Sequence, residues 1–445
     1  MLNLNFVILG DFMKDIPEGS YFVSAYPPFS QWQQALRGAY EVALDSSGKQ
    51  RGDSPTGIYL HVPFCGKRCD FCYYLSYAGQ SAQTIARYVE AVKEEIGMLA
   101  ATTALKNQPI SFIYIGGGTP SILKETDLIS IGESLRNHFD CTSLKEFSFE
   151  CAPKTVSDTK IDILKQIGVT RLSLGVQQYN DTILKANGRI HLVKDIDRAY
   201  ASIIGKAFQV INIDLIVGMI GETEETFFQS LAAVTKMSPD TITIYQLEMP
   251  FNTPLYKAYK AGTLKQPMAS WQIKQQRLKQ AFAYLAQRGY TRTSAYMAVK
   301  NVNQENFLYQ DLQYQGGNLI GLGAASFSYF NGVHHQNVAS NDAYFEAIEN
   351  NQFPLGRAYV LDDLQQAVRE LILQFKLGKV NCEILYRKYG VNLIKLYRKQ
   401  LDDLVETKRI AIENNIIIVS DDGMLEVDRI VHRFYLPQHQ QTRSV

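Results

Sequence analysis

The chain has 445 residues, 46% of them hydrophobic, which is enough for the core of one large domain and one or two smaller ones. Its 45 basic and 44 acidic residues give a formal charge of +1, which argues against a nucleic-acid partner or a polybasic membrane patch. With no basic leader, no apolar run long enough to span a membrane and only six cysteines, we expect a cytoplasmic protein without a membrane partner.

The first 55 residues are irregular, and we expect residues 1–55 to be an N-terminal extension with one amphipathic helix over Trp32–Leu44. From residue 58, apolar runs alternate with helical patterns. The runs predict six buried strands, over Ile58–Pro63, Ser111–Ile115, Glu146–Glu150, Arg171–Val176, Val210–Val217 and Thr241–Leu247. The helical patterns cover Thr84–Ala100, Glu125–Phe139, Val156–Ile167, Leu192–Ala207 and Glu222–Lys236. This alternation predicts an α/β domain of parallel strands over residues 56–265.

Polar or glycine residues lie at or near the end of every predicted strand. They are the segment from His61 to Cys72, the segment from Gly116 to Pro120, Glu150, Gln177, Asp214, and Gln246 with Glu248. In a parallel barrel the carboxyl ends of all strands open on one face, which carries the chemistry. The pattern therefore favours a partial (β/α)6 barrel, and a doubly wound open sheet is the alternative.

The rest of the chain predicts a segment that completes the barrel and a small final domain. Residues 266–358 hold a helix over Ser270–Arg288, a short strand near Thr291–Met297 and the glycine-rich segment Gly316–Ala324. Residues 359–445 predict a C-terminal winged-helix-like α/β accessory domain. Its expected helices and strands are Asp362–Phe375, Cys382–Tyr389, Leu393–Glu406, Ile410–Ile412 and Ile416–Val419.

Three cysteines, Cys65, Cys69 and Cys72, stand within eight positions in the spacing CxxxCxxC. Three thiolates in one short loop can hold a cubane [4Fe-4S] cluster and leave its fourth iron without a protein ligand. That open iron can chelate the amino and carboxylate groups of S-adenosylmethionine (SAM), whose reductive cleavage gives a 5′-deoxyadenosyl radical. Lys67 and Arg68 would offset the negative charge of the cluster.

Zinc is the main alternative at the cysteine loop, because His61 could serve as a fourth ligand. A merely structural or oxidised group of cysteines is a further alternative.

We interpret His191, His334 and His335 as surface or core histidines. The three scattered cysteines, which we expect to be buried apolar residues, are Cys141, Cys151 and Cys382.

Further polar and glycine residues fit a ligand at the same face. The turn from Gly116 to Thr119 allows close approach of the backbone to a ligand. Glu150 and Asp214 interrupt apolar strands, where ribose hydroxyls or an ammonium group would satisfy them; a salt bridge to a neighbouring loop is the alternative.

As a set, these motifs resemble the HemN-like branch of the radical SAM superfamily. The matching segments, which extend over nearly the whole chain, are IYLHVPFC, CxxxCxxC, GGGTP, SFECAP, RLSLGVQ, NIDLIVG and ILQFKLGKV. The branch includes oxygen-independent coproporphyrinogen III oxidase, the heme chaperone HemW and class C radical SAM methyltransferases. The resemblance implies a partial (β/α)6 radical SAM barrel with a C-terminal accessory domain.

The resemblance also implies which residues bind cofactors. Positions that match contacts to the cluster-bound SAM are Tyr59, Gly117, Glu150 and Phe327. Positions that match contacts to a second SAM are Phe71, Gly118, Thr119, Gln177, Arg189 and Asp214. Two bound SAM molecules are therefore expected.

Two departures from the family pattern point to the reaction. Tyr73 and Tyr74 follow the third cysteine where the decarboxylating oxidase has Gly-Cys, and Glu248 stands where an alanine is expected. Our first reading is class C methyl transfer or cyclopropanation at an sp² carbon. The alternatives are coproporphyrinogen III oxidation and heme binding of the HemW type. We expect substrate contact or proton transfer from Tyr73, Tyr74, Tyr77 and Glu248.

The partners implied by this reading are a conjugated or tetrapyrrole-like small molecule and a one-electron donor such as flavodoxin or ferredoxin. We expect the protein to be a monomer.

Overall fold

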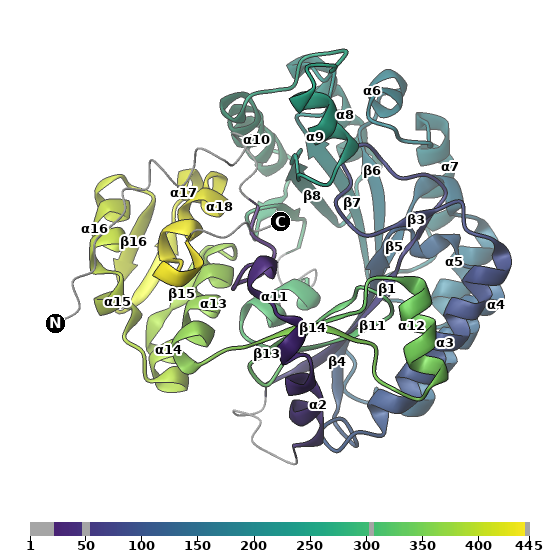
Figure 1. Ribbon diagram of the computed structural model, residues 1–445. Helices are drawn as coiled ribbons and strands as arrows, with labels where there is room; N and C mark the ends of the chain where they lie inside the picture. Colours follow the sequence, from purple (N-terminus) through teal and green to yellow (C-terminus); the bar gives the residue numbers. More distant parts are fainter. Residues whose placement is uncertain (1–21, 47–53, 302–306, 441–445) are drawn as a thin grey trace.

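The computed structural model describes residues 22–46, 54–301 and 307–440, and its main element is a twelve-stranded sheet that curves around a central space (Figure 1). The strand order is β14-β13-β12-β11-β1-β4-β5-β6-β7-β8-β10-β9. The seven strands from β11 to β8 in this order are parallel to one another. These parallel strands are β11 (Asn318–Leu322), β1 (Thr56–Val62), β4 (Ile110–Gly117), β5 (Glu146–Cys151), β6 (Arg171–Gln177), β7 (Val210–Val217) and β8 (Thr241–Gln246).

All six strands predicted between residues 58 and 247 are present, and the expected α/β partial barrel is confirmed. Strand β1 is buried at every position, as its apolar sequence requires. Helices cover the outside of the sheet (Figure 1). They are α3 (Ala82–Ala100), α4 (Glu125–His138), α5 (Asp158–Gln166), α7 (Val193–Ile203), α8 (Glu224–Met237) and α10 (Trp271–Ala286). Because these strands run parallel, their carboxyl ends lie at the same face of the barrel.

Strand β11 comes from the glycine-rich segment and pairs in parallel with β1, on the side away from β4. The sequence pattern did not predict it, because Gly321 interrupts its short apolar run and further glycines flank the strand. Gly321 is required here: a Cβ would lie 2.5 Å from the carbonyl oxygen of Phe327 in β12. Antiparallel strands then extend the sheet, with α12 (Asn341–Glu349) between the last two. They are β12 (Phe327–Phe330), β13 (Val333–Asn337) and β14 (Leu355–Val360).

Three predicted elements differ from the structure. The helix expected over Trp32–Leu44 is a 3-10 turn followed by α2 (Gly38–Asp45), because Gln33 adopts an extended conformation and pairs with Ala358. The strand expected near Thr291–Met297 is two short strands, β9 (Thr291–Arg292) and β10 (Met297–Val299).

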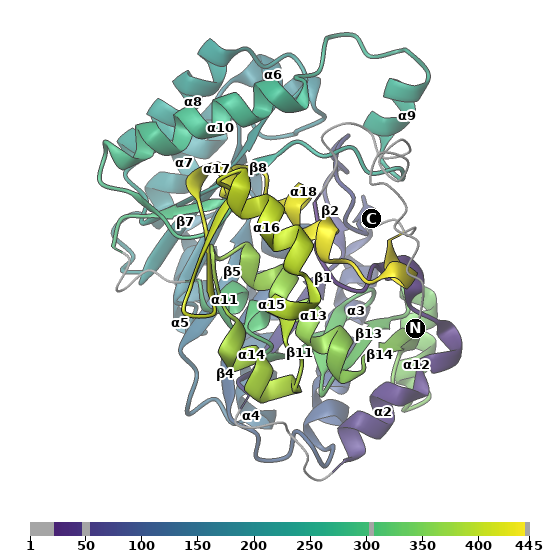
Figure 2. The same cartoon turned by 90° about the vertical axis from the view of Figure 1, so that its left-hand side faces the viewer.

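The third difference lies in the C-terminal unit, where the helix expected over Leu393–Glu406 is divided at Tyr397. Tyr397 leaves the helical conformation, with φ −108° and ψ 26°, and its hydroxyl donates to the Phe434 carbonyl at 2.7 Å. The unit has its own buried core and lies against one side of the barrel (Figure 2). It contains α13 (Asp363–Phe375), β15 (Lys379–Asn381), α14 (Cys382–Tyr389), α15 (Leu393–Leu396), α16 (Arg398–Glu406), β16 (Ile410–Glu413), β17 (Ile416–Val419), α17 (Asp421–Leu425) and α18 (Val427–Val431).

An ion pair within this unit is linked to the barrel through Tyr296. Lys376 Nζ lies 2.7 Å from Asp428 Oδ1, and the other carboxylate oxygen accepts a hydrogen bond from the Tyr296 hydroxyl. Tyr296 precedes β10 and packs at 5.8 Å between ring centroids on Tyr245 of β8. The domain boundaries proposed from the sequence remain predictions. No helix among the described residues is long and apolar enough to cross a membrane.

A buried carboxyl group, Glu95 of α3, connects the outer helices to the sheet. It accepts hydrogen bonds from the Gly323 amide at 2.7 Å, from Asn337 Nδ2 at 2.6 Å and from the Tyr344 hydroxyl at 2.7 Å. Burial raises the pKa of Glu95 to about 7, and the three hydrogen bonds oppose this shift. Its protonation state is therefore coupled to folding.

We expect Glu95→Gln to change how stability depends on pH. The folded-state pKa lies above the ordinary value of 4.5, so the folded state holds the proton more tightly and the wild-type free energy of unfolding falls as pH rises from 4.5 to about 7. The variant cannot titrate there and should lack this fall, which amounts to about 3 kcal/mol. Urea denaturation across this pH range measures it, with the exposed Glu133→Gln as control; equal pH slopes for wild type and Glu95→Gln would contradict the assignment.

Candidate active site

The loop that follows β1 carries the three clustered cysteines, and we call residues 63–76 the cysteine loop. The parallel register places His61 beside Gly116 and Val62 beside Gly117 of β4. The Gly118 amide donates to the Val62 carbonyl at 2.8 Å, so the glycine turn after β4 lies against the start of the loop. Tyr88 of α3 fixes this start from outside, since its hydroxyl donates to the His61 carbonyl at 2.7 Å.

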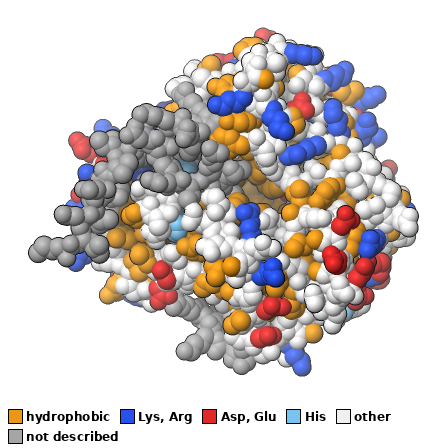
Figure 3. All heavy atoms as spheres, viewed as in Figure 1, with side chains coloured by type: hydrophobic (Ala, Val, Ile, Leu, Met, Phe, Trp, Pro, Cys, Tyr) orange, Lys and Arg blue, Asp and Glu red, His pale blue; other side chains and the backbone are white. Residues whose placement is uncertain are grey.

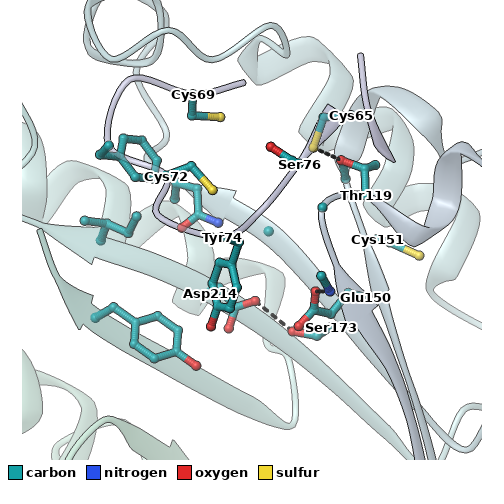
Figure 4. A pocket seen from close by; sticks show the side chains of 18 of the residues that line it. Cys65, Cys69, Cys72, Tyr74, Ser76, Thr119, Glu150, Cys151, Ser173 and Asp214 are labelled. Carbon is teal, nitrogen blue, oxygen red and sulfur yellow. Dashed lines mark hydrogen bonds between the residues drawn. The ribbon is translucent and has the colours of Figure 1, made fainter. Parts of the chain in front are cut away.

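The sulfur atoms of Cys65, Cys69 and Cys72 face a common space at the carboxyl ends of the strands (Figure 4). Thr119 Oγ1 donates to Cys65 Sγ at 3.4 Å, and Arg189 Nη1 donates to Cys69 Sγ at 3.2 Å. Burial raises the pKa of Cys65, and it raises the pKa of Cys72 to about 11. Without a metal these thiols stay protonated at neutral pH, so metal loading must displace their protons.

The donor set fits an iron–sulfur cluster better than a zinc ion. His61, the fourth ligand that zinc would need, is engaged at both ring nitrogens: Nδ1 lies 3.0 Å from the Tyr59 hydroxyl and Nε2 lies 3.2 Å from the Leu75 carbonyl. No three His, Cys, Asp or Glu side chains in the described part of the chain surround a point where a single ion would sit. Three thiols in one loop match the ligand set of a cluster with one open iron.

The glycine turn after β4 leaves room beside the cysteine loop. Gly117 has φ +116°, a conformation that favours glycine. A Cβ on Gly118 would lie 2.7 Å from the Phe64 carbonyl oxygen and 3.0 Å from Cys65 Sγ. Glycine at position 118 therefore lets the backbone lie closer to the cluster position than a residue with a side chain would allow.

Below the cysteine loop, the barrel encloses a chamber of about 300 Å³. Glu150 of β5 faces it and accepts hydrogen bonds from the Tyr114 hydroxyl and, at 3.1 Å, from the Gly117 amide. Asp214 of β7 accepts from Ser173 Oγ at 2.8 Å and from Asn212 Nδ2 at 2.9 Å. Neither carboxylate forms an ion pair with any residue that the structure describes, which disfavours the salt-bridge alternative.

Removal from bulk water raises the pKa of both carboxyl groups, and it raises that of Glu150 to about 7. A cationic ligand beside these carboxyl groups would lower both pKa values again, because it favours their ionised form. The attraction between the opposite charges would in turn strengthen binding of the ligand. The sulfonium group of SAM is such a cation. The two side chains are therefore suited to the cofactor contacts predicted for them.

Gln177 and Arg189 lie at the same face. Gln177 ends β6 with φ +66°, and Arg189 Nη2 donates to the Gly175 carbonyl at 3.0 Å. Arg189 Nε is buried without a hydrogen-bond partner, so the guanidinium retains a donor. All the predicted contacts to a second SAM line the chamber: Phe71, Gly118, Thr119, Gln177, Arg189 and Asp214.

Two predicted SAM contacts are not among the chamber-lining residues. Tyr59 is buried beneath Tyr114 and Tyr309, and Phe327 stacks on Phe29 with 4.4 Å between ring centroids. Their contact with SAM stays a prediction from the resemblance.

An aromatic wall closes the chamber on the side of β8. Tyr73 and Tyr74 stack with ring centroids 4.6 Å apart, and Tyr245 and Glu248 line the same space. Tyr73, Tyr74 and Glu248 therefore line the chamber, and their contact with a substrate stays a prediction. Tyr77 does not share them, because it is absent from the lining and its hydroxyl donates to the Ala339 carbonyl at 2.9 Å.

The sequence did not single out several residues of the lower wall, because no motif marks them. The structure brings them in from β6, the segment before β10, the segment before α11 (Leu308–Tyr314) and α18: Arg171, Tyr296, Phe307 and Asp428. The sequence offered one clue, an arginine within an apolar strand, at Arg171. In the structure this side chain is only 3% exposed. Of the histidines, His191, His334 and His335 are buried, and Cys151 points away from the other sulfurs (Figure 4).

We expect Gly118→Ala to impair cluster binding. Its Cβ would overlap the Phe64 carbonyl and press on Cys65 Sγ, and overpacking of this kind costs about 1–3 kcal/mol. The reconstituted variant should hold less iron and sulfide than the wild type and show weaker cluster absorbance. The control is Gly38→Ala, whose Cβ meets nothing within 4 Å; equal iron contents in the two variants would refute this account of the turn.

Comparisons with known proteins agree with this geometry. Residues 59–234 match the model of the radical SAM superfamily. The chain is 30% identical over 302 residues to the heme chaperone HemW of Synechocystis sp., covering 66% of this chain and 71% of that protein. It is 26% identical over 405 residues to the oxygen-independent coproporphyrinogen III oxidase of Escherichia coli, covering 87% of each chain.

The solved structure of coproporphyrinogen III oxidase (HemN) from Escherichia coli superposes with a TM-score of 0.79 at 22% identity, covering 93% of this chain and 96% of that one. This likeness concerns the fold, and it includes the C-terminal unit as well as the barrel. Together with the superfamily match and the sequence relatives, it places the chain in the HemN-like family of radical SAM proteins.

Proposed function

We propose that this radical SAM enzyme acts on a conjugated or tetrapyrrole-like small molecule, with oxidation of a tetrapyrrole of the coproporphyrinogen type as the leading reaction. The observation that carries the proposal is a chamber lined together by the cysteine loop, the carboxyl groups of Glu150 and Asp214, and an aromatic wall. A [4Fe-4S] cluster with bound SAM would supply a 5′-deoxyadenosyl radical at the top of this chamber.

The residues of the chain then have separate tasks. Cys65, Cys69 and Cys72 hold the cluster at the chamber mouth. Glu150 and Asp214 attract the positive charge of SAM: both are held by neutral hydrogen-bond donors, and Arg171 acts on Asp214 without forming an ion pair with it. The barrel encloses the site and keeps bulk water from a radical formed there. Binding of a second SAM is part of the proposal and rests on the resemblance.

The names of the relatives favour tetrapyrrole chemistry over methyl transfer. The two sequence relatives and the solved structure described above are named as a heme chaperone and as coproporphyrinogen oxidases. None of these names refers to a class C methyltransferase, although class C methyl transfer is the reaction that the sequence pattern favours first. Oxidative decarboxylation of a porphyrinogen acid is therefore the better-supported proposal.

Methyl transfer remains a second candidate because of one local feature. The stacked pair Tyr73–Tyr74 occupies the position of the Gly-Cys pair in the oxidase, so the thiol expected there is missing. Apart from the three loop cysteines, the only cysteine lining the chamber is Cys151, whose pKa is raised to about 12 by burial. Replacement of the thiol by tyrosine would favour use of the radical for methyl transfer instead of oxidative decarboxylation.

We expect the reconstituted enzyme, with reductant and SAM, to release 5′-deoxyadenosine, and Cys69→Ser to release none above background. Coproporphyrinogen III should raise the yield and give CO₂, measured by chromatography and mass spectrometry. Cys141→Ser, outside the chamber, is the matched control and should behave as the wild type.

Other products would identify the other candidates. S-adenosylhomocysteine or methylthioadenosine formed together with 5′-deoxyadenosine would favour methyl transfer. Stoichiometric heme binding without SAM cleavage would favour a chaperone of the HemW type. Absence of SAM cleavage under every reducing condition would overturn the proposed enzymatic function.

A further inference from the structure

The cysteine loop and the segments next to it carry five exposed lysines, which we call the basic rim: Lys67, Lys154, Lys185, Lys257 and Lys260. Two of them, Lys67 and Lys154, also line the chamber. In Figure 3, lysine and arginine side chains gather on the upper right of the molecule, where Figure 1 places α6 (Asp181–Ala186), α7 and α9 (Pro254–Lys260). The whole chain has a formal charge of only +1, so this concentration of positive charge is local.

Backbone contacts hold the segments of the rim against the cysteine loop. The Asp70 amide donates to the Asn187 carbonyl just after α6 at 3.4 Å, and the Leu255 amide at the start of α9 donates to the Asp70 carbonyl at 2.9 Å. Lys154 Nζ donates to the Ile190 carbonyl at 3.4 Å. The lysines of α6 and α9 therefore flank the loop that would hold the cluster.

The acidic residues in these segments do not cancel the exposed positive charge. Asp70 is half-buried and turned towards the backbone at Gly188, where a Cβ would lie 2.8 Å from its Oδ1. Asp181 is half-buried and accepts a hydrogen bond from the Val193 amide at 2.8 Å. The cysteine loop, α6 and α9 therefore carry exposed lysines and no exposed acidic side chain.

Two exposed apolar side chains lie within the basic rim. Ile190 is 40% exposed and faces Gly66 of the cysteine loop, and Tyr259 of α9 is 45% exposed. An apolar centre within a polar, charged border is the usual anatomy of a protein–protein interface. Apolar contact supplies affinity, and the border supplies steering and orientation.

We propose that the basic rim docks an acidic one-electron carrier protein directly over the cysteine loop. The inference rests on the proposed function, because only a radical SAM enzyme needs this electron. Lys67 lies between Cys65 and Cys69, at most about 7 Å of chain from each, so a partner that contacts it lies next to the cluster. One electron leaves the reduced carrier, which is oxidised, and reduces the cluster; no proton or other group is transferred.

The test uses the full chain with reconstituted cluster and an acidic flavodoxin as probe. The rim variant combines Lys185→Glu, Lys257→Glu and Lys260→Glu, none of which lines the chamber. The control has the same charge change at exposed lysines elsewhere and combines Lys106→Glu, Lys145→Glu and Lys395→Glu.

We expect the rim variant to bind flavodoxin about ten-fold more weakly than the wild type, as the loss of several exposed charge pairs predicts. Wild-type binding should weaken as salt is added, and the rim variant should lose this dependence. SAM cleavage driven by flavodoxin should slow in the rim variant alone, whereas cleavage driven by dithionite should be equal in all three proteins.

Equal flavodoxin affinities of the rim and control variants would overturn the docking proposal. So would wild-type binding that is insensitive to salt, or no binding of either flavodoxin or an acidic ferredoxin. Rim-dependent binding in a protein that never cleaves SAM would leave the docking surface standing and refute the proposed function. The two proposals therefore fail by different results.

Discussion

Parallel pairing of β1 with β4 is the constraint on which the rest of the site depends. Its register sets His61 beside Gly116 and Val62 beside Gly117, so that the cysteine loop and the glycine turn leave the sheet together. A slip of one residue would turn every side chain of β1 to the opposite face. Because β5 to β8 continue the same parallel ladder, Glu150 and Asp214 also depend on this register.

The chamber contains two carboxyl groups, Glu150 and Asp214, that form no ion pair with the described residues, although Arg171 opposes the rise in the pKa of Asp214. Its two central carboxylates are held by hydroxyl, amide and backbone donors, and such neutral donors position a charge without cancelling it. This arrangement lowers the stability of the fold, because hydrogen bonds offset only part of the free energy lost when the carboxylates are removed from water. A site of this kind is expected where the compensating charge arrives with a ligand.

Much of the barrel could be predicted because its strands are uninterrupted apolar runs with polar residues at one end. Strand β11 could not, since glycines hide its periodicity and its partner β1 is more than 250 residues away. Pattern also could not show which side of a strand faces the chamber. Tyr59 matches a family motif and yet packs with Tyr114, while Tyr296 matches no motif and lines the site. Those placements depend on tertiary packing.

The ion pair between Lys376 and Asp428 has a consequence for how the protein is made. Asp428 supplies part of the chamber wall and holds Tyr296, so the wall is incomplete until the ribosome has released residues near 428. The cysteine loop emerges about 360 residues earlier, and domains generally fold in the order of synthesis. During translation the lower wall of the chamber is therefore completed last, after the parallel strands and the cysteine loop have already left the ribosome.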